Sequence, residues 1–271
     1  MKDRQKILVY ATTIIGCLII LAPLFWMLVT SFKTFGETLQ VDGPLLPQNP
    51  TLDNYKQVVE TLPMGQLTLN TVVVMFFSII GSVLNCSLAA FALVYLKIPG
   101  AKYILIFILS FAMIPGEVFT IPVYNIMNQL GLINTLTAIV IPKSLYTLGV
   151  LLMYQAFKTI PSSIIESARL DGASWLRVYA RVAMPLAKSS IVSLSILVAL
   201  FVWKELLWVI VVNHDLDKMT LGPGIARLGG SAFTEYNLMM AADVLAIIPM
   251  LIIFLVLQKQ FMKTAIDSSV K

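Results

Sequence analysis

The chain has 271 residues, of which 58% are apolar and only 12% are charged. A soluble globular domain carries about 25% charged residues, so this composition excludes an ordinary water-soluble fold. The mean hydropathy of +0.88 and the long apolar runs indicate an integral membrane protein with several spans. Cys17 and Cys86 both lie in apolar runs, and His214 is the sole histidine, so neither a disulfide framework nor a histidine-ligated metal site is expected. We expect no cofactor bound by this chain.

Six apolar stretches have the length needed to cross a bilayer core of about 30 Å. They lie near residues 7–32, 67–96, 103–127, 136–157, 190–212 and 239–261. The sequence therefore predicts an all-α integral membrane protein with six transmembrane helices in a single domain, 1–271. An even number of spans places both termini on the same side of the membrane.

The basic residues predict which side that is, because lysine and arginine are enriched in short cytoplasmic loops. With the N terminus inside, most of the basic residues fall on the cytoplasmic side, and the outer side receives only Lys33, Lys56, Lys218 and Arg227. Both termini are thus predicted to be cytoplasmic. The longer connections are then 34–66 and 213–238 outside, and 158–189 inside. In the second of these, a glycine-proline turn is expected within 215–224 and a flexible glycine pair at 229–230.

The inner loop, 158–189, contains signals for two short helices. Ser163 and Glu166 have the spacing of a capping box, which predicts that the first helix covers 164–171. Gly172 is placed to end this helix, because glycine takes the left-handed conformation at little cost. Ser174 can cap the next helix.

The second helix of this loop is predicted to be amphipathic and to end near Pro185. Arg177 and Arg181 fall on one face. Apolar residues recur at a spacing of three and four on another face, namely Trp175, Val178, Tyr179 and Val182. This pattern is typical of an interfacial helix lying on a membrane surface. An amphipathic connector without a partner would have the same pattern.

Residues 166–173 read Glu-Ser-Ala-Arg-Leu-Asp-Gly-Ala, and Val-Ala-Met-Pro follows at 182–185. This array resembles the EAA loop of permease subunits of binding-protein-dependent ABC importers. The family pattern is Glu-Ala-Ala, a glycine shortly after, and a distal Leu-Pro, so Ser167 and Met184 are small departures that keep the spacing. The resemblance covers nearly the whole chain and points to the carbohydrate-uptake, maltose-type group, through segments 23–33, 89–100, 121–135 and 248–261.

This resemblance implies a type I ABC importer permease fold and a subunit with no hydrolytic chemistry of its own. In such importers the EAA helix, here within 161–185, docks on a cytoplasmic ATPase subunit that uses the ATP. The residues to which the resemblance assigns ATPase coupling are Glu166, Ser167, Ala168, Asp171, Gly172 and Ala173. The implied partners are a second, nonidentical permease subunit, an ATPase dimer and an extracytoplasmic solute-binding protein, which the 215–230 region is expected to face. The implied location is the bacterial inner membrane, crossed several times.

Polar residues within the apolar stretches are candidates for a solute path, because a charge at bilayer depth costs roughly 2.5–3.5 kcal/mol on insertion scales. The candidates are Glu117, Asn125, Trp203, Lys204 and Glu205. Hydrogen bonding between helices is the alternative role. Lys204 and Glu205, if adjacent on a helix, would project about 100° apart. The resembled group often has Trp-Asn where this chain has Trp203-Lys204, which leaves an anionic or modified sugar open as the solute.

The sequence is thus interpreted as the permease subunit of an ATP-driven importer of a sugar or oligosaccharide. It contains no Gly-x-x-x-x-Gly-Lys-Ser/Thr phosphate loop, so the energy source is expected on another chain. Within the same class, the solute could instead be a polyamine, an amino acid or a glycerol phosphodiester. An ion-coupled secondary transporter is an alternative that only the intramembrane acids support. A membrane-bound enzyme is disfavoured because no nucleophile-and-base or metal-ligand spacing is present.

Overall fold

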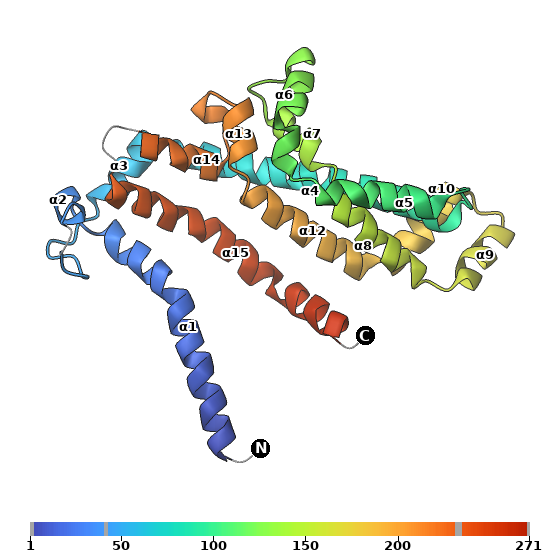
Figure 1. The fold of residues 1–271 in the computed structure, drawn as a ribbon, viewed down its shortest axis with the longest axis horizontal. Helices are drawn as coiled ribbons and strands as arrows, with labels where there is room; N and C mark the ends of the chain where they lie inside the picture. Colours follow the sequence, from blue (N-terminus) through green and yellow to red (C-terminus); the bar gives the residue numbers. More distant parts are fainter. Residues whose placement is uncertain (1–2, 41–42, 231–234, 270–271) are drawn as a thin grey trace. The chain divides into compact units, whose positions relative to one another are not determined.

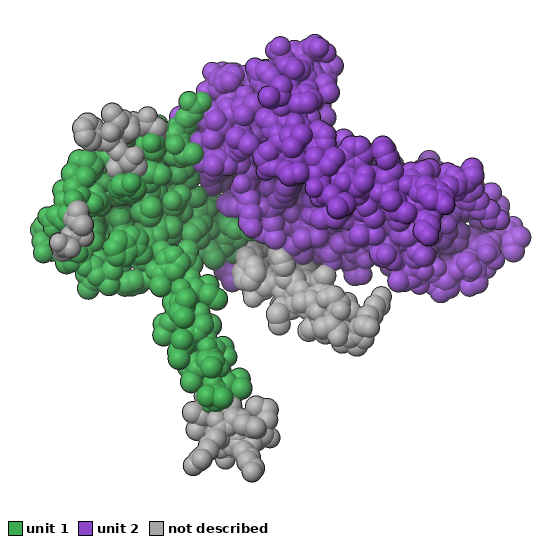
Figure 2. Space-filling model, in the orientation of Figure 1, with its two compact units in different colours: residues 1–65, 224–254 green, residues 66–223, 255–271 purple. Residues whose placement is uncertain are grey.

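A computed structural model describes residues 3–40, 43–230 and 235–269, and every regular element among them is helical. The chain divides into two compact units, which Figure 2 shows in different colours. Unit 1 comprises residues 1–65 and 224–254, and unit 2 comprises residues 66–223 and 255–271.

Unit 1 is organised by buried amides at the end of its first long helix. Its helices are α1 (Asp3–Ser31), α2 (Phe35–Thr38), α3 (Asp53–Thr61), the 3-10 helix η5 (Arg227–Gly230) and the first part of α15 (Tyr236–Ser269). The Asn54 side chain on α3 donates to the carbonyls of Ser31 and Lys33, both at 2.8 Å. Asn237 on α15 donates to the Asn54 side-chain oxygen at 2.8 Å. These bonds satisfy carbonyls that the end of α1 leaves without intrahelical partners.

Unit 2 contains one long unbroken helix and several shorter ones. Its helices are α4 (Met64–Tyr95, from Gln66 on), α5 (Ala101–Ser110), η1 (Phe111–Met113), η2 (Gly116–Phe119), α6 (Thr120–Gln129), α7 (Leu136–Lys143), α8 (Thr147–Lys158), α9 (Ser162–Leu170), α10 (Trp175–Val178), the π-helix η3 (Tyr179–Ala183), α11 (Met184–Leu186), α12 (Lys188–Trp203), α13 (Leu207–Val212), η4 (Leu216–Lys218) and the start of α14 (Leu221–Ala226). Helices α5, α8 and α12 lie side by side, and α9 with α10 lies at one end of them (Figure 1).

The predicted stretches 7–32 and 67–96 correspond to single helices, α1 and α4. Within the described residues these are the only two helices that are long and apolar enough to cross a membrane alone. Three further candidates are helix pairs bent at a short break, and Tyr236–Ile252 forms a shorter apolar helix. The structure therefore agrees with the all-helical prediction, while several stretches expected to be continuous are interrupted.

The stretch 103–127 is divided by a bend of 94° between Ala101–Met113 and Gly116–Gln129. Pro115 causes the break, because a proline disfavours helical backbone in the residue before it. Accordingly, Ile114 is extended, with ψ at 125°. The apolar run alone therefore overstated the length of this helix.

The stretch 136–157 is bent by 45° between α7 and α8. Pro142 lies in the last turn of α7 and has no backbone N–H to donate to the carbonyl of Ala138. The indole of Trp208, on α13, donates to that carbonyl at 3.0 Å. A side chain from another helix thus replaces the missing intrahelical bond.

The stretch 190–212 is also interrupted, since α12 ends at Trp203 and α13 begins at Leu207. The expectation that Lys204 and Glu205 lie on one continuous helix is wrong. Lys204 is the C-cap of α12, and its amide still donates to the carbonyl of Leu200. Glu205 lies beyond the helix, in the break.

Helix α4 holds the break between α7 and α8 with three side chains. Ser82 donates to the carbonyl of Lys143 at 2.9 Å, Asn85 to that of Ser144 at 3.2 Å, and the Cys86 thiol to that of Tyr146 at 3.2 Å. Carbonyls at the end of a helix need such partners when water is absent. Gly81 of α4 permits the close approach, because a Cβ there would lie 2.3 Å from the Ser144 hydroxyl oxygen.

Candidate coupling loop and solute path

Helix α9 begins without the predicted capping box. It spans Ser162–Leu170, its N-cap is Pro161, and no side chain caps it. Ser163 is already inside the helix, where its carbonyl accepts from the Ser167 hydroxyl at 2.8 Å. A residue with helical backbone cannot serve as the N-cap, so the expected pairing of Ser163 with Glu166 and the helix bounds 164–171 are wrong.

The end of α9 follows the prediction. Gly172 has φ at +80°, in the left-handed region that favours glycine. The amide of Gly172 donates to the carbonyl of Arg169, and that of Ala173 to the carbonyl of Ala168, both at 3.1 Å. These two bonds are the Schellman motif that closes a helix. The prediction for Ser174 is also confirmed, since its side chain accepts from the amide of Arg177 at 3.3 Å.

Arg169 fixes the turn between α9 and α10. One of its guanidinium nitrogens donates to the carbonyl of Ala173 at 2.5 Å, across the turn. The guanidinium also lies 4.5 Å from the centre of the Trp175 ring, within range of a cation–π contact. This contact was not predicted from the sequence. The available signal was an arginine and a tryptophan placed on either side of a helix-ending glycine.

An aromatic cluster joins this loop to α4 and α8. The ring of Phe91 on α4 lies 5.4 Å from that of Tyr179, 6.2 Å from Trp175 and 5.9 Å from Phe157 on α8. The Tyr179 hydroxyl also forms a 2.7 Å hydrogen bond with the hydroxyl of Ser87. Edge-to-face ring contacts of this kind are specific as well as apolar.

The apolar face of the second helix is therefore packed on other helices of the same unit. Val178 is fully buried and Tyr179 is 7% exposed. The expectation of an interfacial helix with this face on the membrane surface is thus wrong. The α-helix also changes to a π-helix at Tyr179, and the segment ending at Leu186 meets α12 at 80°. Arg177 and Arg181 are exposed, as the pattern predicted.

The residues expected to contact an ATPase subunit lie mostly on the outside of the loop. Glu166, Ser167, Asp171 and Gly172 are exposed, while Ala168 and Ala173 are half-buried. Leu170 is 88% exposed, whereas Ile165 on the opposite side of α9 is 4% exposed. The arrangement is a short helix, closed at its C-terminus and anchored by its neighbours, that presents carboxylates and an apolar side chain outward.

Among the residues expected along a solute path, Glu205 has a specific partner. Its carboxylate forms an ion pair with the ammonium of Lys143 at the end of α7, and the two side chains are 14% and 12% exposed. Its other oxygen accepts from the amide of Trp208 at 2.9 Å. The Lys143 ammonium lies 4.3 Å from the centre of the Phe201 ring. The ion pair therefore connects the α7–α8 break with the α12–α13 break.

Of the other expected path residues, Trp203 and Lys204 adjoin Glu205 at the end of α12, whereas Glu117 and Asn125 lie on other helices. Trp203 is half-buried and Lys204 is exposed at the break. Glu117 on η2 and Asn125 on α6 are exposed, and neither forms a side-chain hydrogen bond or ion pair with another described residue. Near them, α6 and α13 form an open groove of about 390 Å³ lined by Thr120, Ile121, Tyr124, Ile210, Val211 and His214.

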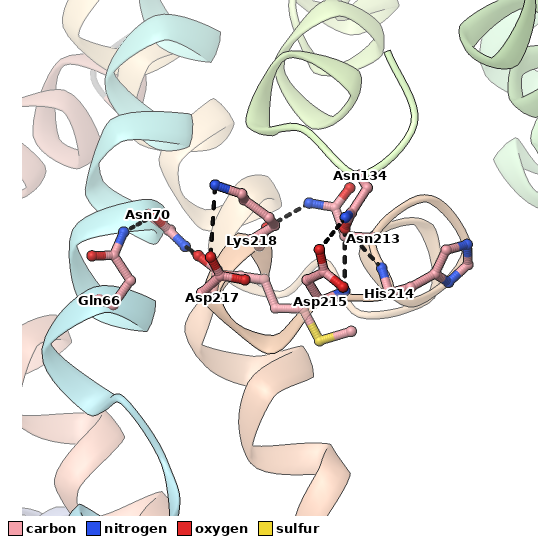
Figure 3. Close-up of polar contacts among 9 residues, drawn as sticks. Gln66, Asn70, Asn134, Asn213, His214, Asp215, Asp217 and Lys218 are labelled. Atoms are coloured by element: carbon pink, nitrogen blue, oxygen red, sulfur yellow. Dashed lines mark hydrogen bonds and ion pairs between the residues drawn. The ribbon is translucent and has the colours of Figure 1, made fainter. Parts of the chain in front are cut away.

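The loop after α13 is held by three asparagines that were not predicted to have this role, and one of them, Asn213, donates to the carbonyl of Lys218 (Figure 3). The Asn134 side-chain oxygen accepts from the amides of His214 and Asp215, both at 3.1 Å, and its amide group donates to the Asp215 carboxylate. The Asn70 amide on α4 donates to the carbonyls of Asp217 and Met219, both at 2.8 Å. These bonds fix the path of the loop backbone.

The glycine-proline turn expected within 215–224 is absent. Residues Leu221–Ala226 form helix α14 instead, and Pro223 lies in its first turn, where the backbone N–H would have no intrahelical partner. The glycine pair expected to be flexible lies in η5 (Arg227–Gly230). Residues 231–234, within the same predicted connection, lie outside the described residues.

Residues 73–265 match the family model described as "binding-protein-dependent transport system inner membrane component". The chain belongs to this family. It is therefore a transmembrane permease subunit of a binding-protein-dependent ABC importer, not its ATPase, and it resides in the inner membrane. The resemblance based on the 166–173 array is confirmed. Permeases of this family work with a partner permease, an ATPase and a solute-binding protein.

This permease also has similar proteins along nearly its whole length. It is 27% identical over 264 residues to the sn-glycerol-3-phosphate transport system permease protein UgpE of Brucella suis, with 94% of each chain covered. It is 28% identical over 264 residues to the UgpE protein of Rhizobium meliloti, with the same coverage. Among solved structures, a bacterial ABC transporter involved in the import of the acidic polysaccharide alginate has 25% identity and a TM-score of 0.78, covering 95% of this chain and 96% of that chain.

Proposed function

We propose that this permease moves a sugar, an oligosaccharide or a closely related polyol derivative from an extracytoplasmic binding protein into the cytoplasm. The relatives named for sn-glycerol 3-phosphate and alginate transport support this class, because both solutes carry several hydroxyl groups. Glycerol phosphodiesters belong to the same chemical range. Polyamines and amino acids have no counterpart among the relatives named above.

The observation that supports a role in coupling is helix α9, which Gly172 ends. A short helix anchored through Arg169 and the Phe91 cluster can transmit a displacement as a rigid lever. We assign contact with the ATPase to Glu166, Ser167, Ala168, Asp171, Gly172 and Ala173. The exposed carboxylates of Glu166 and Asp171 suit charge-assisted hydrogen bonds with basic groups of a partner.

The proposed topology has six spans with both termini and the 158–189 loop in the cytoplasm. The bent pair Ala101–Met113 with Gly116–Gln129 and the bent pair α7 with α8 then each count as one crossing, and α12 with α13 forms the fifth. The apolar part of α15, Tyr236–Ile252, supplies the sixth span. The exposed Arg177, Arg181 and Lys188 of the loop support this orientation, because basic residues favour the cytoplasmic side. The 215–230 region then faces the solute-binding protein, and the second permease subunit is a different chain.

The solute path is assigned to Glu117, Asn125, Trp203, Lys204 and Glu205. The last three lie at the break between α12 and α13, and interrupted helices line solute sites in other transporters. Alanine variants of the five would be compared for solute affinity in complexes that retain ATPase coupling. Unchanged transport in all five would remove this assignment.

The proposed function is tested by uptake into proteoliposomes that contain the whole complex. The reconstitution uses this chain, its partner permease, the ATPase and the binding protein, and the solute is the one that copurifies with the binding protein. We expect uptake that requires enclosed ATP and the binding protein, and that continues when an uncoupler abolishes ion gradients at constant ATP. Uptake that stops with the uncoupler would instead favour an ion-coupled transporter.

A further inference from the structure

Among the described residues, the charges at the break between α12 and α13 do not balance. Lys143 and Glu205 neutralise each other, and both side chains are largely buried. Lys204, adjacent to Glu205 in the sequence, is exposed, and its side chain has no hydrogen bond, ion pair or ring contact in the described part of the chain. One positive charge is therefore left uncompensated beside a neutral pair.

Lys204 lies at the end of α12, inside the predicted span 190–212. Helix α12 has 16 residues before it, and α13 continues for six residues beyond the break. At a rise of about 1.5 Å per residue, α12 covers roughly 24 Å of an apolar layer about 30 Å thick. Ionisable groups within spans are rare and almost always face the bundle interior, a water-filled cavity or a charged partner.

The face of α12 that bears Lys204 is suited to a carbohydrate-like solute. Phe201 lies three residues earlier and Leu197 seven residues earlier, so both share this face at helical spacing. They are 45% and 41% exposed. Phe201 also packs against Tyr146 at the neighbouring break, with ring centroids 5.8 Å apart. An exposed aromatic ring followed by a free ammonium can contact the apolar face of a sugar and an anionic group on it.

We propose that the solute carried by this permease bears a carboxylate or phosphate group, and that Lys204 is the residue that selects for it. The inference rests on the proposed import function and names the charge class of the solute. Lys143 is not the contact, because Glu205 already occupies its ammonium. The same ion pair neutralises the Glu205 carboxylate, so it does not repel an anion.

The test begins with the ligand that copurifies with the binding protein encoded beside this chain, identified by mass spectrometry. That solute is then the probe in proteoliposomes that contain the whole complex with Lys204→Gln, Lys204→Arg or Lys204→Glu. We expect an anionic ligand, and a KM for uptake raised about tenfold or more by Lys204→Gln, as for the loss of a charge-assisted hydrogen bond. Lys204→Arg should keep most of the affinity, and Lys204→Glu should abolish uptake.

The matched control is Lys102→Gln, which removes an exposed lysine from α5 and should leave the KM unchanged. Basal ATPase activity of the Lys102→Gln complex should equal that of the wild type, and subunit assembly is checked for every variant. Mass spectrometry distinguishes a carboxylate from a phosphate, and either supports the inference.

Three results would overturn the inference. They are a neutral copurifying ligand, an unchanged KM in Lys204→Gln, and a failure of Lys204→Gln to assemble, which would show that Lys204 pairs with an acid of the second permease. Failure of the proposed function is a different result, because the wild-type complex would then show no ATP-dependent uptake.

Discussion

At the scale of single residues, Gly172 determines how α9 ends. Its φ of +80° is required by the closing bonds of the helix, while the space around it is open, with no atom within 4 Å of the position that a Cβ would take. The constraint is therefore conformational and not steric. A β-branched residue resists the left-handed conformation, whereas asparagine adopts it more readily than most other residues.

We predict that Gly172→Val abolishes most ATP-dependent uptake while the protein remains in the membrane. The left-handed conformation costs a residue with a Cβ about 1–2 kcal/mol, enough to favour a different path between α9 and α10. Gly172→Asn should retain more uptake than Gly172→Val. Uptake and ATPase stimulation by loaded binding protein are the measurements, and equal activity of the two variants would count against the argument.

The residues of the loop were predicted unevenly from the sequence. Gly172 and Ser174 act locally, so their types and spacing were sufficient to predict the closure of one helix and the cap of the next. The pairing of Glu205 with Lys143 was not predictable, because 62 residues separate the two and hydropathy carries no information on which spans touch. The roles of Asn70 and Asn134 could not be predicted for the same reason, since each binds a backbone segment that is distant in the sequence.

At the scale of helices, the interruptions are the feature that hydropathy missed. An apolar run records composition, but not the direction of the backbone, so 103–127 and 190–212 were interpreted as continuous. A proline inside an apolar run can kink a helix, and the breaks near Pro115 and Pro142 agree with this expectation. The second break, after Trp203, has no proline, and the Lys143–Glu205 ion pair that holds it is visible only in the structure.

We predict that removing either Lys143 or Glu205 alone lowers the stability of the protein more than removing both charges together. Removing one partner of a buried ion pair costs about 3–5 kcal/mol, because it leaves an uncompensated charge, whereas replacing both is often nearly neutral. Lys143→Met and Glu205→Gln should each lower the melting temperature in detergent, and the double variant should recover most of the loss. Glutamine can still accept from the Trp208 amide, so this comparison isolates the charge. Additive losses in the double variant would contradict the prediction.

Close contact between α4 and the α7–α8 break makes Gly81 intolerant of a side chain. A Cβ would lie 2.3 Å from the Ser144 hydroxyl oxygen and 2.6 Å from its Cβ, so the break must move. Gly81→Ala should destabilise the protein by about 1–3 kcal/mol, as overpacking does elsewhere. Gly65→Ala in the same helix is the control, because nothing lies within 4 Å there. Thermal unfolding in detergent measures both, and an equal stability of the two variants would refute the contact.

At the scale of the whole molecule, the family assignment agrees with a chain whose charged residues are few but specifically placed. The all-helical class followed from composition, and the permease identity followed from the resemblance of the 166–173 array and of other segments to a known family. The helical class and the closure of α9 could be predicted because membrane insertion and helix ends are encoded locally. The arrangement of the helices was not encoded in that way.

We predict that Glu166→Lys leaves the complex in the membrane but disconnects ATP hydrolysis from transport. Reversing an exposed charge on α9 replaces an attraction to a basic partner by repulsion, which we expect to lower uptake more than about tenfold. Glu60→Lys, an exposed glutamate on α3, is the matched control. Uptake and ATPase activity would be measured on the same reconstituted samples. Wild-type coupling in Glu166→Lys would exclude this surface as the ATPase contact.

Helix α4 contacts three parts of unit 2 that are distant in the sequence, and it fixes their rotational positions about its own axis. Along its unbroken length it binds the 217–219 backbone through Asn70, the 143–146 break through Ser82, Asn85 and Cys86, and the α10 segment through Ser87 and Phe91. Deleting one residue from its middle would rotate one half against the other by about 100°. The two ends of the unit would then be out of register, although no contacting side chain had been removed.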